Sequence, residues 1–487
     1  MSKVSRRPAR EAAQQELQKK HQQCELRRQQ QAAGLILPTE PAPASRCCPY
    51  KTIEQEREAR IRSLTEHARL IRSQWPVLLR RLRTIHDPRN PKTIQHALSC
   101  LMLYGLLVFV LQFSSRRHAN TEITRPMFEQ NLRLLFPELD HLPHADTLFR
   151  LLCKIDVSQI EQAHIDLVQQ LIRKKKFAHY RINNCYPIAI DGTQKMCGST
   201  VWCDALQERR VSGAEPDAPE QLRYRYSVYV LEANLCFHNG MVIPLMSEFL
   251  DYQQGDTEHN KQDCELRAFH RLGARIKKAF AKLPIMLLLD GLYPNAPLLS
   301  RCQNYNWDFM IVLKDDSLPT VWEEFHGLRT LKPEPVHRQN WGKRSQQFQW
   351  VNDIRYEYGQ NGRQHHSVHL VVCTEEWREV DEHGQIVDKT AKHAWISSRR
   401  LHPQNLHQRC NLAARHRWGI ENCILVEKHQ GYSYEHLFAK HWNAMRGYHY
   451  LMRLAHLLNT LARFCSVLRA QHIAMGIQAF ISFVRST

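Results

Sequence analysis

The sequence lacks the cysteine spacing of a zinc site and of a disulfide-rich protein. It has 15 cysteines, an odd number, and no Cys-x-x-Cys pair among them. Cys197 and Cys203 lie near each other, and His365, His366 and His369 cluster, but neither group has a matching second half for zinc. Because disulfide frameworks belong to short secreted chains, we expect reduced thiols and no structural zinc.

The sequence also lacks a long hydrophobic run. The longest apolar stretch, Cys100 to Phe113, is shorter than the roughly 20 residues that a membrane-spanning helix needs. The first residues, including Arg6 and Arg7, lead into glutamine-rich sequence without the apolar core of a signal peptide. We therefore expect a buried core helix at the apolar stretch, no membrane partner and a cytoplasmic protein.

Acidic residues are scarce relative to basic ones. The chain has 67 Lys+Arg against 48 Asp+Glu, which gives a formal net charge of +19. Such a balance indicates a polyanionic partner, with nucleic acid ahead of an anionic membrane. The alternative is a generically basic surface, because net charge describes association rather than fold.

Composition and periodicity predict a mixed α/β protein. Its 487 residues suffice for several domains and a large core. The expected parts are a basic arm and linker at 1–48, a helical DNA-binding region at 49–180, a first core segment at 181–319, a β insertion at 320–402, C-terminal core helices at 403–470, and a tail at 471–487. Polar and aromatic residues alternate in the insertion, with turn sequences at Asn361-Gly362 and Glu382 to Gly384, so we expect antiparallel strands there.

Two apolar runs end abruptly in an Asp-Gly pair. One runs from Tyr186 to Asp191 and the other from Ile285 to Asp290. Runs of this length look like buried strands, and a strand that ends in a carboxylate places it at the sheet rim, where active sites of α/β proteins form. The alternative for either Asp-Gly pair is an ordinary turn.

A third segment places a carboxylate between two basic residues on a predicted helix from Leu406 to Lys428. Arg417, Glu421 and Lys428 fall within about 40° of one another at roughly 100° per residue. A glutamate in that setting can ligate a metal between two groups that grip phosphates. The alternative is a face of ordinary solvated charges.

The order Asp191, Asp290 and Glu421 resembles the acidic triad of DDE transposases, which have a ribonuclease-H-like core. The spacing of Arg417, Glu421 and Lys428 is similar to the signature of bacterial insertion-sequence transposases with a β insertion between the second Asp and the Glu. The gap of about 130 residues between Asp290 and Glu421 agrees with such an insertion. The likeness covers roughly residues 140 to 460.

The resemblance implies an activity, a cofactor and partners. It implies cut-and-paste transposition, in which two Mg²⁺ ions, replaceable by Mn²⁺, are held by Asp191, Asp290 and Glu421. The partners would be the terminal inverted repeats and target DNA, bound by a homodimer on paired ends in the bacterial nucleoid. Alternatives are a metal-dependent nuclease without strand transfer and a non-catalytic DNA-binding remnant.

Some residues depart from the family or carry competing interpretations. Ala414 stands where the family usually has a tyrosine, which affects one expected DNA contact. Trp395 lies where the family often has a tryptophan that stacks on a flipped base, but a buried packing role fits it equally. Asp263 and Glu265 open a predicted helix, where we expect them to serve its N-terminal dipole, with Asp263 as reserve ligand.

Overall fold

The computed structural model describes residues 7–32, 48–139, 141–211, 223–250, 261–331, 336–359, 364–380 and 385–486. The chain forms two compact units. The smaller unit comprises Met1–Pro49 and Val312–Leu406, and the larger unit comprises Tyr50–Ile311 and His407–Thr487. The two turn sequences predicted in the insertion, at Asn361-Gly362 and Glu382 to Gly384, lie outside the described residues.

The larger unit begins with helices, as the sequence predicts. They are α2 (Ile53–Leu82), α3 (Leu98–Val110), α4 (Arg116–Ile123), α5 (Pro126–Leu135), α6 (Ala145–Leu152) and α7 (Ser158–Arg173). All but one residue of α3 is buried, because α13 (Trp442–Arg463), α6 and α2 pack around it. The long apolar stretch is therefore a core helix. Within the described residues, no helix is long and apolar enough to cross a membrane.

The strands of the larger unit form a mixed arrangement. They are β1 (Tyr186–Gly198), β2 (Gln207–Val211), β3 (Arg223–Cys236), β4 (Val242–Phe249), β5 (Ile285–Leu289) and β6 (Asp308–Val312). β1 is antiparallel to β3 but parallel to β5, and β5 is parallel to β6. Every residue of β5 is buried, as expected for a central parallel strand. The fold is thus mixed α/β, as predicted.

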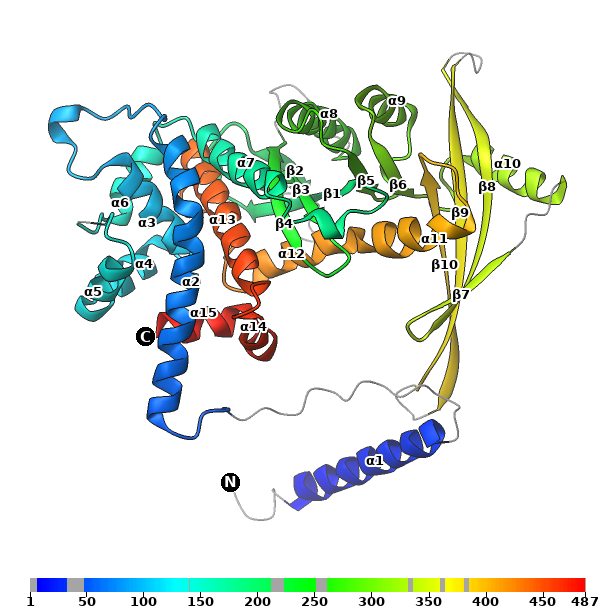
Figure 1. Cartoon of the computed structure of the whole chain (residues 1–487), viewed down its shortest axis with the longest axis horizontal. Helices are drawn as coiled ribbons and strands as arrows, with labels where there is room; N and C mark the ends of the chain where they lie inside the picture. Colours follow the sequence, from blue (N-terminus) through cyan, green and yellow to red (C-terminus); the bar gives the residue numbers. More distant parts are fainter. Residues whose placement is uncertain are drawn as a thin grey trace, which may run out of the picture. The chain divides into compact units, whose positions relative to one another are not determined.

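Helices cover both sides of these strands. Helices α8 (Lys261–Ala279) and α9 (Ala296–Tyr305) lie on one side, and α12 (Trp418–His429) lies on the other (Figure 1). Helix α8 packs on β3 and β4, while α12 packs on β1, β3 and β4. The C-terminal helices α14 (Arg469–Met475) and α15 (Ile477–Arg485) complete this unit. The predicted strand–hairpin–helix–strand–helix–strand order is confirmed.

The smaller unit is mainly antiparallel. Its strands are β7 (His337–Trp341), β8 (Arg344–Tyr358), β9 (Gln364–Val380) and β10 (Ile386–Ser397), each antiparallel to its neighbour. It also contains α1 (Arg7–Ala32), α10 (Pro319–Leu331) and the short α11 (Pro403–Leu406). The predicted strands are confirmed, but the first part of the insertion is helix α10, because Val321, Trp322 and Phe325 form an apolar helical face.

Candidate active site

The two aspartates are placed by adjacent parallel strands. Ala189 of β1 pairs with Leu288 of β5, and the same register carried two residues further sets Asp191 opposite Asp290. Both aspartates therefore leave the carboxyl end of the β1–β5 pair, where active sites of α/β sheets form. Asp290 follows the last residue of β5 and accepts a hydrogen bond from the backbone of Leu292 at 3.0 Å.

The predicted strand end at Asp191 is wrong. β1 continues through Asp191 to Gly198, and Asp191 pairs with Glu232 of β3. The extension exists because β3 continues past the end of β5 and supplies antiparallel hydrogen bonds there. Gly192 is thus a strand residue rather than a turn residue, and its role needs another explanation, which Glu265 supplies below.

The predicted continuous helix from Leu406 to Lys428 is also interrupted. A π-helical turn spans His407–Ala413 and a 3₁₀ turn spans Ala414–Arg417, so α12 begins only at Trp418. The cause is a buried arginine in the π-helical turn. Arg409 is 1% exposed, donates to the carbonyl of Phe309 at 3.1 Å and pairs with Asp308 at 3.6 Å. This anchor to β6 sets where α12, and with it Glu421, begins.

Arg417 and Glu421 contact each other despite the irregular helix start. Nη2 of Arg417 donates to Oε1 of Glu421 at 2.8 Å. Arg417 is 7% exposed, whereas the Glu421 side chain keeps 30% of its surface exposed. The arginine is therefore a buried support for Glu421, and the carboxylate remains open to a ligand.

The electrostatics of Asp191 connect the three predicted acidic residues. Burial raises the pKa of Asp191 to about 6. The Arg417 guanidinium works in the opposite direction, while the charges of Glu421 and Asp290 raise the pKa further. The backbone N–H of Gly192, which donates to the Asp191 carboxylate at 3.0 Å, lowers it slightly. Asp191 thus lies within interaction range of both other members of the triad.

This donor set fits a divalent cation. Carboxylate oxygens are the ligands that Mg²⁺ prefers, and mutual repulsion between them is relieved by a cation. A second observation is Tyr293, which is 1% exposed and whose hydroxyl has no hydrogen-bond partner among the described residues. Burial raises the pKa of Tyr293 well above its ordinary value, and Glu265, Asp290 and Asp191 raise it further. A buried unpaired hydroxyl thus lies among carboxylates.

Glu265 is a residue whose place the sequence did not predict. It is 7% exposed, and its Oε1 atom lies 3.0 Å from where a side chain on Gly192 would begin. Its carboxylate therefore passes over the residue that follows Asp191. The available signal was the Asp191-Gly192 pair itself, because a glycine inside a strand often marks a close approach. The side chain of Asp263 is not among the described ones.

Lys428 and Trp395 have partners inside their own units. Nζ of Lys428 pairs with Oε1 of Glu435 at 2.9 Å, and the lysine side chain is 17% exposed. Trp395, in the smaller unit, is 4% exposed and stacks on His393 with ring centroids 5.5 Å apart. These contacts support a packing role for Trp395. Stacking on a flipped base stays a prediction.

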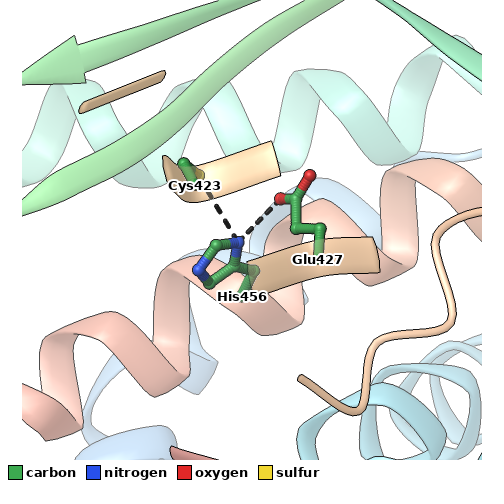
Figure 2. Close-up of side chains that lie close together, drawn as sticks. All are labelled: Cys423, Glu427 and His456. Atoms are coloured by element: carbon green, nitrogen blue, oxygen red, sulfur yellow. Dashed lines mark hydrogen bonds and ion pairs between the residues drawn. The ribbon is translucent and has the colours of Figure 1, made fainter. Parts of the chain in front are cut away.

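A second cluster of possible metal ligands lies deeper in the larger unit. Among the described residues, Cys423, Glu427 and His456 are the group whose ligand atoms all lie within 4.8 Å of one another. Figure 2 shows Cys423 and Glu427 directed at the imidazole of His456. The acidic triad is not grouped this tightly in the described structure, so its metal-bridging geometry stays a prediction.

The chemistry of this second cluster favours an ion-pair network. Arg453 donates to both oxygens of Glu427, at 3.0 and 3.2 Å, and thereby supplies the positive charge. Burial raises the pKa of the Cys423 thiol well above its ordinary value, which disfavours the thiolate that a metal would need. We therefore interpret the cluster as a support that ties α12 to α13.

A polar hollow of 960 Å³ opens elsewhere on the larger unit. It lies where α4 and α6 approach the far end of β1 and the segment after α12. Arg116, Arg117 and Lys440 line it, together with Glu435, the partner of Lys428. Arg116 pairs with Asp146 at 3.1 Å, whereas Arg117 and Lys440 are exposed. The hollow is large enough and basic enough for a phosphate chain.

The fold and the carboxylates describe an α/β protein with an acidic centre beside a helical region. Residues 79–168, from the end of α2 to α7, match the DDE_Tnp_1-associated family. This domain is typical of insertion-sequence transposases, and it associates the chain with the DDE_Tnp_1 transposases. The match ends before the first strand, so the catalytic domain itself is not detected. No curated protein matches the chain.

Proposed function

We propose that the protein is a DDE transposase that cleaves DNA at the ends of its own mobile element and joins those ends to target DNA. The observation that carries the proposal is the mutual influence of Asp191, Asp290 and Glu421, reflected in the pKa of Asp191. The transposase-associated domain at residues 79–168 supports it independently. The larger unit would then be the ribonuclease-H-like core, with the antiparallel strands β7–β10 as its insertion.

Asp191, Asp290 and Glu421 would hold two Mg²⁺ ions. When bound, such ions activate a water or a 3′-hydroxyl and stabilise the attacking and leaving oxygens of an in-line displacement at phosphorus. The adjacent strands β1 and β5 supply a rigid base for two of the ligands. Helix α12 brings the third from the other side of the sheet.

The remaining residues of the site act on these carboxylates. Asp191 must lose its proton to ligate a cation, and with a pKa of about 6 it does so just below neutral pH. Arg417 favours that ionised form and directs Glu421 through their 2.8 Å hydrogen bond. Arg417 therefore positions ligands rather than gripping DNA from the surface, which refines the role expected from the sequence.

DNA contacts would lie in the basic hollow and on the N-terminal region. The exposed side chains of Arg117 and Lys440 are suited to backbone phosphates, and the associated domain contributes the first of them. Lys428 reaches the same region through Glu435. Helix α1, rich in Arg, Lys and Gln, supplies further positive charge for the terminal repeats. Two protomers would pair the two element ends.

The test uses the purified full chain with duplexes that contain the terminal sequences flanking its gene. We expect Mg²⁺-dependent nicking at the repeat boundary, followed by joining of the freed 3′ end to a target plasmid. Asp191→Asn, Asp290→Asn and Glu421→Gln should each abolish both steps while DNA binding persists, since they alter ligands and not the basic surfaces. Glu323→Gln, an exposed change on α10, is the matched control and should leave both steps intact.

The same assay separates the competing functions. Cleavage without joined product would identify a metal-dependent nuclease. Binding of the repeats without cleavage at any Mg²⁺ or Mn²⁺ concentration would identify a non-catalytic remnant and refute the proposal. Full activity in any one of the three ligand variants would remove that residue from the site.

A further inference from the structure

Glu265 lies in an unusual position for a helix-opening carboxylate. A glutamate that serves a helix dipole sits at the surface of the first turn. Glu265 lies one turn into α8 and is 7% exposed, so its charge is directed into the protein. The expectation that Glu265 serves the helix N-terminus does not explain this burial. Burying a carboxylate is costly unless its environment compensates for the lost water.

The strand beneath Glu265 is shaped to admit it. A side chain on Gly192 would begin 3.0 Å from Oε1 and 3.2 Å from the carboxyl carbon of Glu265. Such contacts are tighter than ordinary packing, so the glycine provides the space in which this carboxylate lies. The backbone of Gly192 is ordinary strand and needs no special torsion angle. The glycine after Asp191 thus makes room for a second carboxylate rather than a turn.

Tyr293 provides an independent indication that Glu265 shares the acidic centre. Among the charged groups that act on the Tyr293 hydroxyl, Glu265 has the largest effect, followed by Asp290 and Asp191. This hydroxyl is buried and has no hydrogen-bond partner among the described residues. Carboxylates from α8, β5 and β1 therefore converge on one buried polar group, from the side of the sheet opposite α12 (Figure 1).

We propose that Glu265 supplies a fourth carboxylate to the divalent-metal site, reaching it across Gly192 from helix α8. This inference rests on the proposed function. Glu421 would then complete the site from the α12 side and Glu265 from the α8 side, with Asp191 and Asp290 between them. Four carboxylates exceed the charge of one divalent cation, which favours a site for two ions.

The test is binding of Mn²⁺ alone to the full-length protein, followed by electron paramagnetic resonance of the free ion. Glu265→Gln preserves shape and removes the charge, and it should raise the dissociation constant of Mn²⁺ by at least about tenfold, the usual loss for a site residue. Glu248→Gln is the matched control. Glu248 pairs with Arg271 and Arg275 of the same helix, so its loss perturbs α8 without touching the acidic centre.

A second variant tests the route across the strand. Gly192→Ala changes no charge but places a methyl group against Glu265, and it should weaken Mn²⁺ binding as well. In the double variant with Glu265→Gln, the two losses should not add, because both act through one carboxylate. If Glu265→Gln does not fold, as judged by its thermal transition, Gly192→Ala decides the question alone.

The outcomes separate this inference from the proposed function. Wild-type Mn²⁺ affinity in both Glu265→Gln and Gly192→Ala, with loss of binding in Asp191→Asn, would overturn the role of Glu265 and leave the transposase proposal standing. Absence of Mn²⁺ binding and of element-end cleavage in the wild type would overturn both.

Discussion

Nη2 of Arg417 donates a hydrogen bond to Oε1 of Glu421 at 2.8 Å, directly before the helix that carries the glutamate begins. The same guanidinium lowers the pKa of Asp191 on β1, against the larger effect of burial. One buried arginine therefore acts on carboxylates from two separate elements. It links the position of α12 to the protonation state of a strand residue.

Removal of this arginine should shift the pH dependence of the protein. Asp191 has a pKa raised to about 6, and Arg417 opposes that rise. In Arg417→Ala the pKa of Asp191 should rise further, so the ionised form that ligates a cation appears only at higher pH. We expect the acid limb of Mn²⁺ binding and of cleavage to move to higher pH, which titrations at a series of pH values measure.

Lys440→Ala is the control for this prediction. Lys440 is exposed and lines the hollow, so its removal should weaken DNA binding without moving the pH midpoint. An unchanged midpoint in Arg417→Ala would show that the guanidinium does not govern Asp191. Arg417→Lys should retain part of the effect on the midpoint, since charge remains while the geometry of the hydrogen bond to Glu421 is lost.

Asp191 should also reduce stability where it is ionised. Its folded-state pKa is raised from 3.8 to about 6, so folding favours the protonated form, and that stabilisation is lost as pH rises through about 6. In metal-free protein, Asp191→Asn should therefore raise the melting temperature by a few degrees above neutral pH. The difference should vanish below about pH 3.8, where the aspartate is protonated in both states. Thermal unfolding at both pH values measures it, and lower stability of the variant at high pH would contradict it.

Local pattern was sufficient for several elements of the larger unit. The apolar run at Ile285–Leu289 forms a buried strand, and the Asn239-Gly240 turn joins β3 to β4. Both depend on short-range sequence, namely a run that only a central strand can bury and a turn that glycine permits. The relative placement of Asp191 and Asp290 also follows, because parallel neighbours end at the same edge.

Features set by distant partners were not predictable. β1 extends past Asp191 because β3 pairs with it, and no local signal announces that pairing. The helix before Glu421 breaks because Arg409 turns inward to Asp308, more than a hundred residues earlier in the sequence. Glu265 looked like a surface residue because Gly192, which makes room for it, is remote in sequence.

The hollow lined by α4 and the segment after α12 should bind DNA phosphates. Arg117→Ala and Lys440→Ala should each weaken binding of element-end duplex, and each should reduce the slope of log affinity against log salt by about 1. The reason is that each loses one phosphate contact and its counterion release. Fluorescence anisotropy at several salt concentrations measures both quantities. Lys278→Ala, an exposed change on α8, is the control.

The outcome against this prediction is specific. If both variants retain the affinity and the salt slope of the wild type, the hollow does not carry the DNA backbone. An equal loss in Lys278→Ala would show that the effect is general to surface charge and not specific to the hollow. A loss confined to Arg117 and Lys440 would assign the associated domain a direct part in holding DNA.

The buried network behind α12 rests on Arg453. This arginine is 2% exposed and binds Glu427 of α12 at 3.0 Å and Glu232 of β3 at 3.2 Å. Glu232 is the residue that pairs with Asp191 across β1 and β3. The arginine therefore holds the helix that carries Glu421 against the strand pair that carries Asp191. Burial raises the pKa of Glu427, but Arg453 and His456 outweigh burial and keep it below its ordinary value.

Arg453→Met should be strongly destabilising. It leaves two buried carboxylates without their cation, a change that typically costs about 3–5 kcal/mol. Arg463→Met, at the exposed end of the same helix, should stay within about 0.5 kcal/mol of the wild type. Denaturant unfolding at neutral pH measures both. The wild-type carboxylates have lowered pKa values and contribute stability above their ordinary pKa of 4.5, which is lost as pH falls. In the variant those pKa values rise, so its deficit relative to the wild type should shrink as pH falls below about 4.5. A deficit that does not change with pH would show that Arg453 stabilises the protein by packing and not by its charge.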